Sequence, residues 1–107
     1  MKVVAWNNGQ HHASGAGYGF KVARTDRDRF FETSWESVIL VLPNGIEIDV
    51  NIAKDSFWSD SCRELISKGI GQWLLESGHA PWSKGAPPEF ELSQVSGNRF
   101  SLGGPET

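Results

Sequence analysis

Strict alternation of apolar and polar residues marks the clearest element of the chain. Residues 38–42 are all apolar, residues 43–45 are Pro-Asn-Gly, and residues 46–52 alternate without a break. Asn and Gly accept the positive φ angles of a tight turn, so the three segments together predict a β-hairpin. The apolar first strand indicates an interior strand covered on both sides. The second strand is expected to turn four aliphatic side chains toward the core: Ile46, Ile48, Val50 and Ile52.

Weaker versions of the same pattern predict further strands toward both ends of the chain. Residues 2–6 and 18–22 have the short, half-apolar form of strands at the surface of a core. Residues 89–95 and 99–102 flank a Ser-Gly-Asn turn, which predicts a second hairpin.

Between residues 60 and 78 the apolar period lengthens to that of a helix. Ser61-Cys62-Arg63-Glu64 has the form of a capping box, and apolar side chains from Cys62 to Trp73 fall on one arc. Gly69 lies on this arc, where it would allow close packing against a strand, whereas nothing in the sequence explains Gly71. Because glycine disfavours a helix by up to about 1 kcal/mol relative to alanine, the sequence leaves open whether the helix is broken near these two residues.

A shorter helix is predicted over residues 26–31, since Thr25-Asp26-Arg27-Asp28 has the form of a helix start. The order of elements indicates an α+β fold. In this fold a curved, mostly antiparallel sheet of about five to six strands packs on one principal helix at about residues 60–78. A length of 107 residues fits one compact domain, assigned to residues 1–102, and residues 103–107 are expected to form a flexible tail.

Charge and cysteine content narrow the classes of function. Ten basic and thirteen acidic residues give a formal net charge of −3, the wrong sign for a dedicated binder of the phosphate backbone. A single cysteine excludes a disulfide framework and a multi-cysteine zinc site, and no metal or cofactor is expected. Residues 1–31 nevertheless hold five basic and two acidic residues. Nucleic-acid binding therefore stays an alternative, through Lys21, Arg24, Arg27 and Arg29.

The sequence has no pattern typical of a membrane or export segment. Its longest apolar run, residues 38–42, is far shorter than the ~20 residues that a membrane helix needs. The first six residues lack the form of a targeting signal. Together with the single thiol, these features predict a cytoplasmic protein without membrane partners.

The most unusual segment is the loop at residues 7–17, Asn-Asn-Gly-Gln-His-His-Ala-Ser-Gly-Ala-Gly. Hairpin loops usually need two to five residues, and longer loops are often functional. Glycines let a ligand approach the backbone closely, although turns alone also explain them. We predict a small binding or adaptor protein that holds a polar ligand or a partner protein at this loop. The candidate ligand-binding residues are Asn7, Asn8, His11, His12, Ser14, Tyr18, Arg27 and Trp82.

Catalysis on an anionic substrate is the alternative hypothesis for the same residues. His11 or His12 would act as a general base beside Asp26, with Arg27 holding the substrate, because an imidazole titrates near neutral pH. No nucleophile elbow, metallohydrolase helix or phosphate-binding loop accompanies these residues. The sequence therefore favours binding over enzymatic activity.

Tryptophans and strand edges indicate how a partner would be held. Five indoles are more than a domain of this size readily buries, so Trp58 and Trp82 are expected to stay partly exposed. Exposed aromatic residues stack bases or anchor partner proteins. Trp6 and Trp73 are expected to pack in the core. The hairpins also present edge strands, through which a homodimer would form.

Three blocks of sequence together carry a resemblance to a known group of proteins. They run from Asn7-Asn8-Gly9 to Gly17-Tyr18-Gly19, from Phe57-Trp58 to Leu65-Ile66, and from Ala80-Pro81-Trp82 to Glu89-Phe90. In these blocks the chain resembles short bacterial hypothetical proteins of the kind carried on mobile elements such as integron gene cassettes. The resemblance implies no activity, cofactor or catalytic residue.

Overall fold

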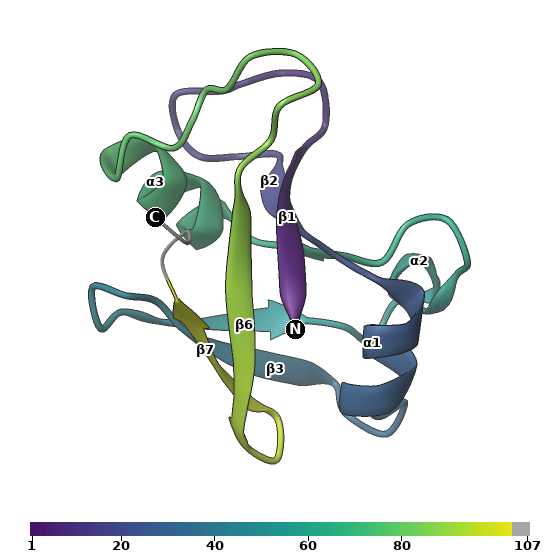
Figure 1. The fold of residues 1–107 in the computed structure, drawn as a ribbon. Helices are drawn as coiled ribbons and strands as arrows, with labels where there is room; N and C mark the ends of the chain where they lie inside the picture. The colour runs from purple at the N-terminus through teal and green to yellow at the C-terminus, as the bar shows by residue number, and fades with distance from the viewer. Residues whose placement is uncertain (104–107) are drawn as a thin grey trace.

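The computed structural model describes residues 1–103, drawn as a ribbon in Figure 1. Three β-hairpins are joined by segments that contain the helices. In chain order the elements are β1 (Lys2–Asn7), β2 (Tyr18–Val22), α1 (Arg24–Phe30), β3 (Ser37–Val41), β4 (Glu47–Asn51), α2 (Asp55–Trp58), β5 (Glu64–Ile66), α3 (Lys68–Glu76), β6 (Glu89–Ser96) and β7 (Arg99–Gly103).

The strands form one sheet in the order β4-β3-β7-β6-β1-β2-β5. Every pairing is antiparallel except that of β3 with β7, which is parallel. The outermost strands of this order, β4 and β5, also contact each other, so the sheet curves until it nearly closes. The α+β fold with a curved, mostly antiparallel sheet is thereby confirmed. The described residues hold seven strands rather than five or six, because β5 was not predicted.

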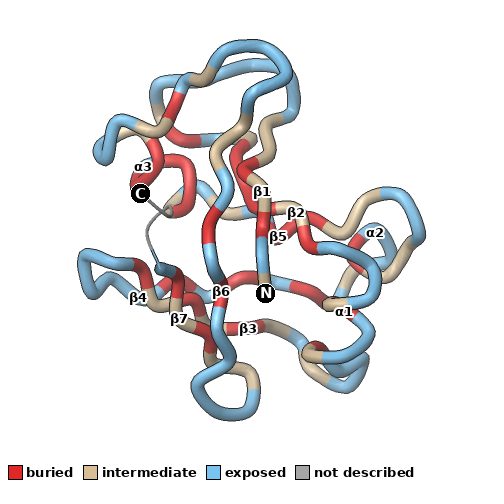
Figure 2. The backbone as a smooth tube through the Cα atoms, in the orientation of Figure 1, coloured by how far each residue is buried: buried red, intermediate tan, exposed pale blue. Residues whose placement is uncertain are grey.

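Alternate positions along most strands are buried, as Figure 2 shows, and their hydrophobic side chains form the core. The central hairpin follows its predicted registration, with Ile48, Val50 and Ile52 in the core. Ile46 was predicted to join them and is instead 55% exposed. It precedes β4 and closes the turn, where its carbonyl accepts from the Leu42 N–H at 2.9 Å. The outward side chains of β3 are half-buried, so this strand is not fully covered on both sides.

The helix predicted at residues 60–78 is shorter and starts later than its capping signal indicates. Residues 64–66 form β5, which pairs with β2, and Leu65 packs into the core opposite Phe20. The helix α3 begins at Lys68, and the Ser67 hydroxyl caps it by accepting from the Gly69 N–H at 3.2 Å. The predicted capping box at residues 61–64 was wrong, because the N–H groups of Cys62 and Arg63 donate to Ser59 and Ser56 and residues 64–66 pair with β2.

The two smaller helices also differ from expectation. The predicted helix at 26–31 exists as α1 but begins two residues earlier, and no side chain caps its start at Ala23. The four-residue helix α2 was not predicted. Gly103, assigned to the tail, is the last residue of β7 and pairs with Glu91. The remainder of that tail, 104–107, lies outside the described residues.

Both glycines of α3 have a packing role, and the helix continues through them. A Cβ atom on Gly69 would lie 2.9 Å from the Ile48 side chain of β4, which is the close packing that its position predicts. A Cβ atom on Gly71 would lie only 2.0 Å from the carbonyl oxygen of Gly15. The backbone of the 8–17 loop therefore rests directly on α3.

Within residues 1–103, none of the helices has the length and apolar composition that a membrane crossing requires.

Candidate functional site

The loop that follows β1 and the loop of residues 80–88 lie side by side at one end of the molecule, at the top of Figure 1. Between them is an open cleft of about 510 Å³. Small-molecule sites commonly have volumes of about 300–1,000 Å³. The end of β1 and its loop contribute Ala5, Trp6, Asn7, Gly9 and His11, and the second loop contributes Trp82, Lys84, Gly85 and Pro87.

The two asparagines at the end of β1 fold the loop by bonding its backbone. The Asn7 side chain accepts from the Gly9 N–H at 2.8 Å and donates to the Gln10 carbonyl at 3.1 Å. The Asn8 side chain accepts from the Gln10 N–H at 3.1 Å and lies against Gly17. Asx turns of this kind are a common use of asparagine. The Asn7 amide therefore lines the cleft with its bonds made inside the loop, whereas Asn8, a predicted ligand-binding residue, folds the loop and does not line the cleft.

His12 and Ser14 form a separate, local contact at the outer side of the loop. The Ser14 hydroxyl lies 2.7 Å from His12 Nδ1, and the Ser14 N–H donates to the same nitrogen at 3.2 Å. The hydroxyl also accepts from the Ala16 N–H at 3.3 Å. His12 is exposed, and neither residue lines the cleft. The adjacent imidazoles thus have different surroundings, because His11 faces the cleft.

His11 is held by two aromatic residues from distant parts of the chain. Its Nδ1 lies 2.7 Å from the hydroxyl of Tyr18, a fully buried residue at the start of β2. Its ring makes edge contacts with Tyr18 and Trp82, at centroid distances of 5.4 and 4.9 Å. Tyr18 and Trp82 also meet edge-on at 5.8 Å. Edge-to-face packing at these distances is favourable, so the three rings fix one another.

The Tyr18 contact selects the nitrogen that His11 presents to the cleft. Burial raises the pKa of Tyr18, so its hydroxyl keeps its proton throughout the neutral range. Among the described residues, His11 Nδ1 is the partner of this hydroxyl, and a buried O–H is satisfied only when it donates. The neutral imidazole then carries its own proton on Nε2. His11 is consequently a donor toward a ligand in the cleft.

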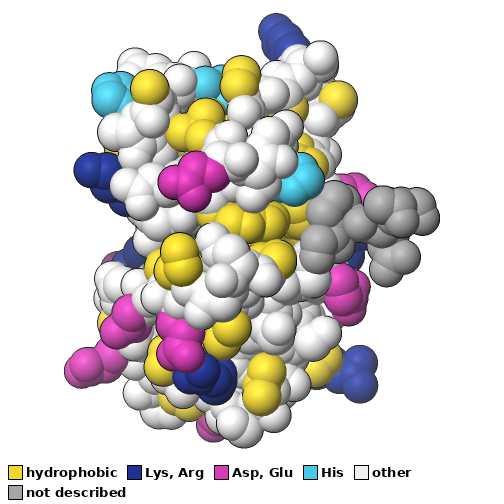
Figure 3. All heavy atoms as spheres, turned by 90° about the vertical axis from the view of Figure 1, so that its left-hand side faces the viewer, with side chains coloured by type: hydrophobic (Ala, Val, Ile, Leu, Met, Phe, Trp, Pro, Cys, Tyr) yellow, Lys and Arg dark blue, Asp and Glu magenta, His cyan; other side chains and the backbone are white. Residues whose placement is uncertain are grey.

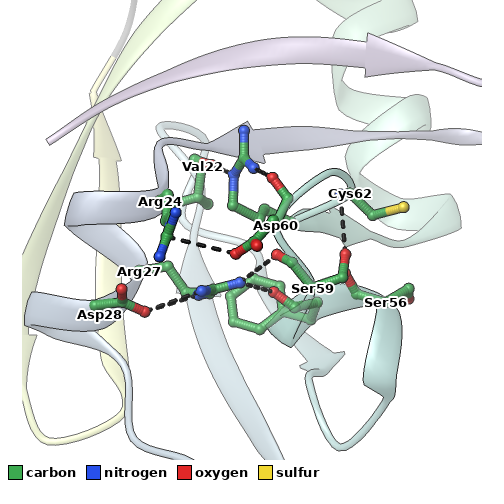
Figure 4. Close-up of polar contacts among 10 residues, drawn as sticks. Val22, Arg24, Arg27, Asp28, Ser56, Ser59, Asp60 and Cys62 are labelled. Carbon is green, nitrogen blue, oxygen red and sulfur yellow. Dashed lines mark hydrogen bonds and ion pairs between the residues drawn. The ribbon is translucent and has the colours of Figure 1, made fainter.

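The other two candidate residues, Asp26 and Arg27, lie on α1 at the opposite end of the molecule from the 8–17 loop. Arg27 is only 4% exposed. Figure 4 shows its guanidinium reaching from α1 to the C-terminal end of α2, where Nη1 donates to the carbonyls of Phe57 at 3.0 Å and Ser59 at 2.6 Å. Nη2 pairs with Asp28 at 3.0 Å. The structure therefore brings His11, Tyr18, Asn7 and Trp82 together and separates them from Asp26 and Arg27.

The tryptophans have three kinds of environment: the core, the cleft and the contacts around α2. Trp73 is in the core as expected, at 6% exposure, and Trp58 and Trp82 are partly exposed as expected. The Trp58 indole donates to the Ile52 carbonyl at 3.0 Å and lies beneath the Arg27 guanidinium, so its role is structural. Trp6, expected in the core, is half-buried and lines the cleft.

The prediction that Trp6 packs in the core was wrong, although the alternation of residues in β1 indicates its true side of the sheet. Val3 and Ala5 face the core, so alternation along β1 turns Trp6 to the opposite side of the sheet. Lys84, Gly85 and Pro87 were missed because nothing in the sequence shows that the 80–88 loop meets the 8–17 loop.

A second, much smaller depression lies between α3 and the turn from β3 to β4. Its volume is about 70 Å³, and Leu42, Ile46 and Trp73 contribute to its lining. Figure 3 views this side of the molecule, where hydrophobic side chains form a band across the middle. The depression has room for only a few water molecules, so the cleft beside His11 is the better candidate site.

Comparisons of the chain with protein-family models, with curated proteins and with solved structures find no match. Within residues 1–103, no three His, Cys, Asp or Glu side chains are grouped closely enough to hold a metal ion.

Proposed function

We propose that this protein binds a polar small molecule in the cleft between residues 8–17 and residues 80–88. The observation that carries the proposal is the position of His11. It lines an open cleft of about 510 Å³ while Tyr18 holds its Nδ1 at 2.7 Å and Trp82 packs against its ring. A donor held in one orientation at the wall of an aromatic cleft is typical of ligand sites.

Preorganisation of the cleft wall supports the same conclusion. The loop that carries His11 is tied by its own asparagines and rests on α3 at Gly71. A loop that is already ordered loses less conformational entropy when a ligand binds. The length of the loop, which first suggested a binding role, is thus compatible with a fixed conformation.

The alternatives have less support from the contacts of their residues. The catalytic hypothesis needs Asp26 and Arg27 beside a histidine, and both lie on α1, away from His11 and His12. The nucleic-acid hypothesis uses Lys21 and Arg27, whose cationic groups donate to backbone carbonyls within residues 57–61. Binding of a small molecule in the cleft does not require these side chains to leave their present contacts. Both alternatives, the homodimer and the resemblance to mobile-element proteins stay predictions.

An NMR screen of a diverse fragment library against the ¹⁵N-labelled protein tests the proposal. Binding fragments are expected to shift the amides of residues 8–17 and 80–88 and the indole N–H signals of Trp6 and Trp82. Replacing His11 by alanine is expected to weaken the best fragment about two- to tenfold, the contribution of one hydrogen bond. His12→Ala is the matched control and is expected to leave the affinity unchanged, because His12 does not line the cleft.

The proposal is wrong if no fragment shifts the cleft signals, or if the shifts collect at another surface such as the depression beside α3. Equal effects of His11→Ala and His12→Ala would remove His11 from the site and overturn the argument from its position.

A further inference from the structure

We propose that the ligand of this cleft is a planar aromatic ring that carries a single negatively charged group. This inference rests on the proposed function and names the chemical class of its ligand. The ring would lie against the indoles of Trp6 and Trp82, and the charge would meet the Lys84 ammonium at the rim.

The walls of the cleft provide the argument for a ring. Trp6 on β1 and Trp82 on the opposite loop are both half-buried, so each indole keeps part of its surface toward the cleft. Pro87 adds a further apolar surface to the cleft lining. Indole faces stack planar ligands with little dependence on the ligand's exact substituents. A branched or purely polar molecule would leave this apolar surface in water.

The floor and rim leave space for a substituent on that ring. Gly9 and Gly85 both line the cleft with positive φ angles, of 103° and 80°. A Cβ atom built on either glycine would meet no other atom within 4 Å. The cleft is therefore open on these two sides, and a group that extends from the ring would reach the rim without a clash.

The polar groups of the cleft provide the argument for a negative charge. All residues that line the cleft lie in the described part of the chain. None of these lining residues is acidic, and Lys84 is the one lysine or arginine among them. The other side-chain polar groups of the lining that have no partner within residues 1–103 are donors. His11 offers Nε2–H, and within residues 1–103 the indole N–H groups of Trp6 and Trp82 donate to no protein acceptor, in contrast to that of Trp58. The Asn7 amide, which would add an acceptor, is engaged within its own loop.

A cleft whose free side-chain groups are donors and one ammonium, with no carboxylate, complements an anion better than a cation. A positively charged ligand would stack on the same indoles through cation–π attraction. It would, however, lie close to Lys84 without an acidic group to balance it. Charge complementarity therefore selects the anionic member among ring-shaped ligands.

Three probes separate the ring from the charge: naphthalene-2-carboxylate, naphthalene-2-carboxamide and cyclohexanecarboxylate. Dissociation constants are measured by NMR titration at low ionic strength. The aromatic carboxylate is expected to bind about threefold more tightly than its neutral amide, the effect of one exposed ion pair. Cyclohexanecarboxylate, which has the charge and lacks the aromatic ring, is expected to bind about tenfold more weakly than naphthalene-2-carboxylate.

Variants of two lysines show whether the preference comes from the cleft. Lys84→Gln is expected to abolish the difference between the aromatic carboxylate and its amide, because it removes the charge that the carboxylate meets. Lys54→Gln, which neutralises a lysine outside the cleft lining, is the control and is expected to retain the threefold preference.

The outcomes distinguish this inference from the proposed function on which it rests. If the amide binds at the cleft as tightly as the carboxylate, or if Lys84→Gln keeps the preference, the anionic class is wrong and the binding site stands. If cyclohexanecarboxylate equals the aromatic carboxylate, the ring is not recognised. If the fragment screen detects ligands at the cleft and neither naphthalene probe shifts it, the class is also wrong. Only the absence of any cleft ligand overturns both.

Discussion

Gly71→Ala is expected to lower the free energy of unfolding by about 3 kcal/mol, the upper part of the range for an added group in a packed interior. The new Cβ atom would lie 2.0 Å from the Gly15 carbonyl oxygen and 2.6 Å from its carbon. Because these are backbone atoms, relief requires that the 8–17 loop move away from α3. Urea denaturation of the wild type and the variant measures the loss.

Gly69→Ala provides the matched control in the same helix. Its Cβ atom would meet the end of the Ile48 side chain at 2.9 Å, which rotates or shifts more easily than backbone. Alanine also favours a helix over glycine by up to about 1 kcal/mol. We therefore expect Gly69→Ala to remain within about 1 kcal/mol of the wild type. Equal losses from the two variants would contradict the contact between α3 and the loop.

Arg27→Met is expected to lower the free energy of unfolding by about 2–4 kcal/mol. The Arg27 guanidinium donates to the carbonyls of Phe57 and Ser59 in a region that is buried or partly buried. Leaving a buried acceptor unpaired costs about 1–3 kcal/mol, and methionine replaces the side chain without replacing the donors. The Trp58 fluorescence is expected to change as well, because the Arg27 cation lies 5.5 Å from the centroid of its ring.

Arg29→Met on the same helix is the control, since Arg29 is exposed. A surface substitution of this kind usually changes stability by less than about 0.5 kcal/mol. If chemical denaturation gives Arg27→Met no larger a loss than Arg29→Met, then Arg27 does not support the loop after α2. Its guanidinium would then be free for the anion-binding role suggested by the sequence.

Elements that depend on short-range patterns could be predicted from the sequence. The hairpin β3/β4 was predicted because its turn residues and its alternation act within about fifteen residues. The segment at Cys62 to Ile66 could not, because apolar residues at 62, 65 and 66 fit a helical arc as well as a short strand. Pairing of Leu65 with Phe20 decides between them, and the two residues are far apart in the sequence.

The parts of the candidate site that depend on local sequence were predicted, and the parts that depend on long-range contacts were not. The 8–17 loop, His11 and Tyr18 were identified because their unusual composition is local. The 2.7 Å contact between His11 and Tyr18 and the meeting with the 80–88 loop depend on how the sheet curves. Arg27 was predicted to bind a ligand because the sequence around an arginine does not show whether its guanidinium binds an anion or a backbone carbonyl.

The account depends most on the claim that the segment of residues 11–15, which places His11 at the cleft, is fixed before any ligand binds. Backbone ¹⁵N relaxation of the free protein tests this claim directly. We expect order parameters of about 0.85 from His11 to Gly15, similar to those of β1 and β2, because Tyr18 and α3 hold this segment from both sides. Values below about 0.6 for the same residues would show a flexible loop and contradict the preformed cleft.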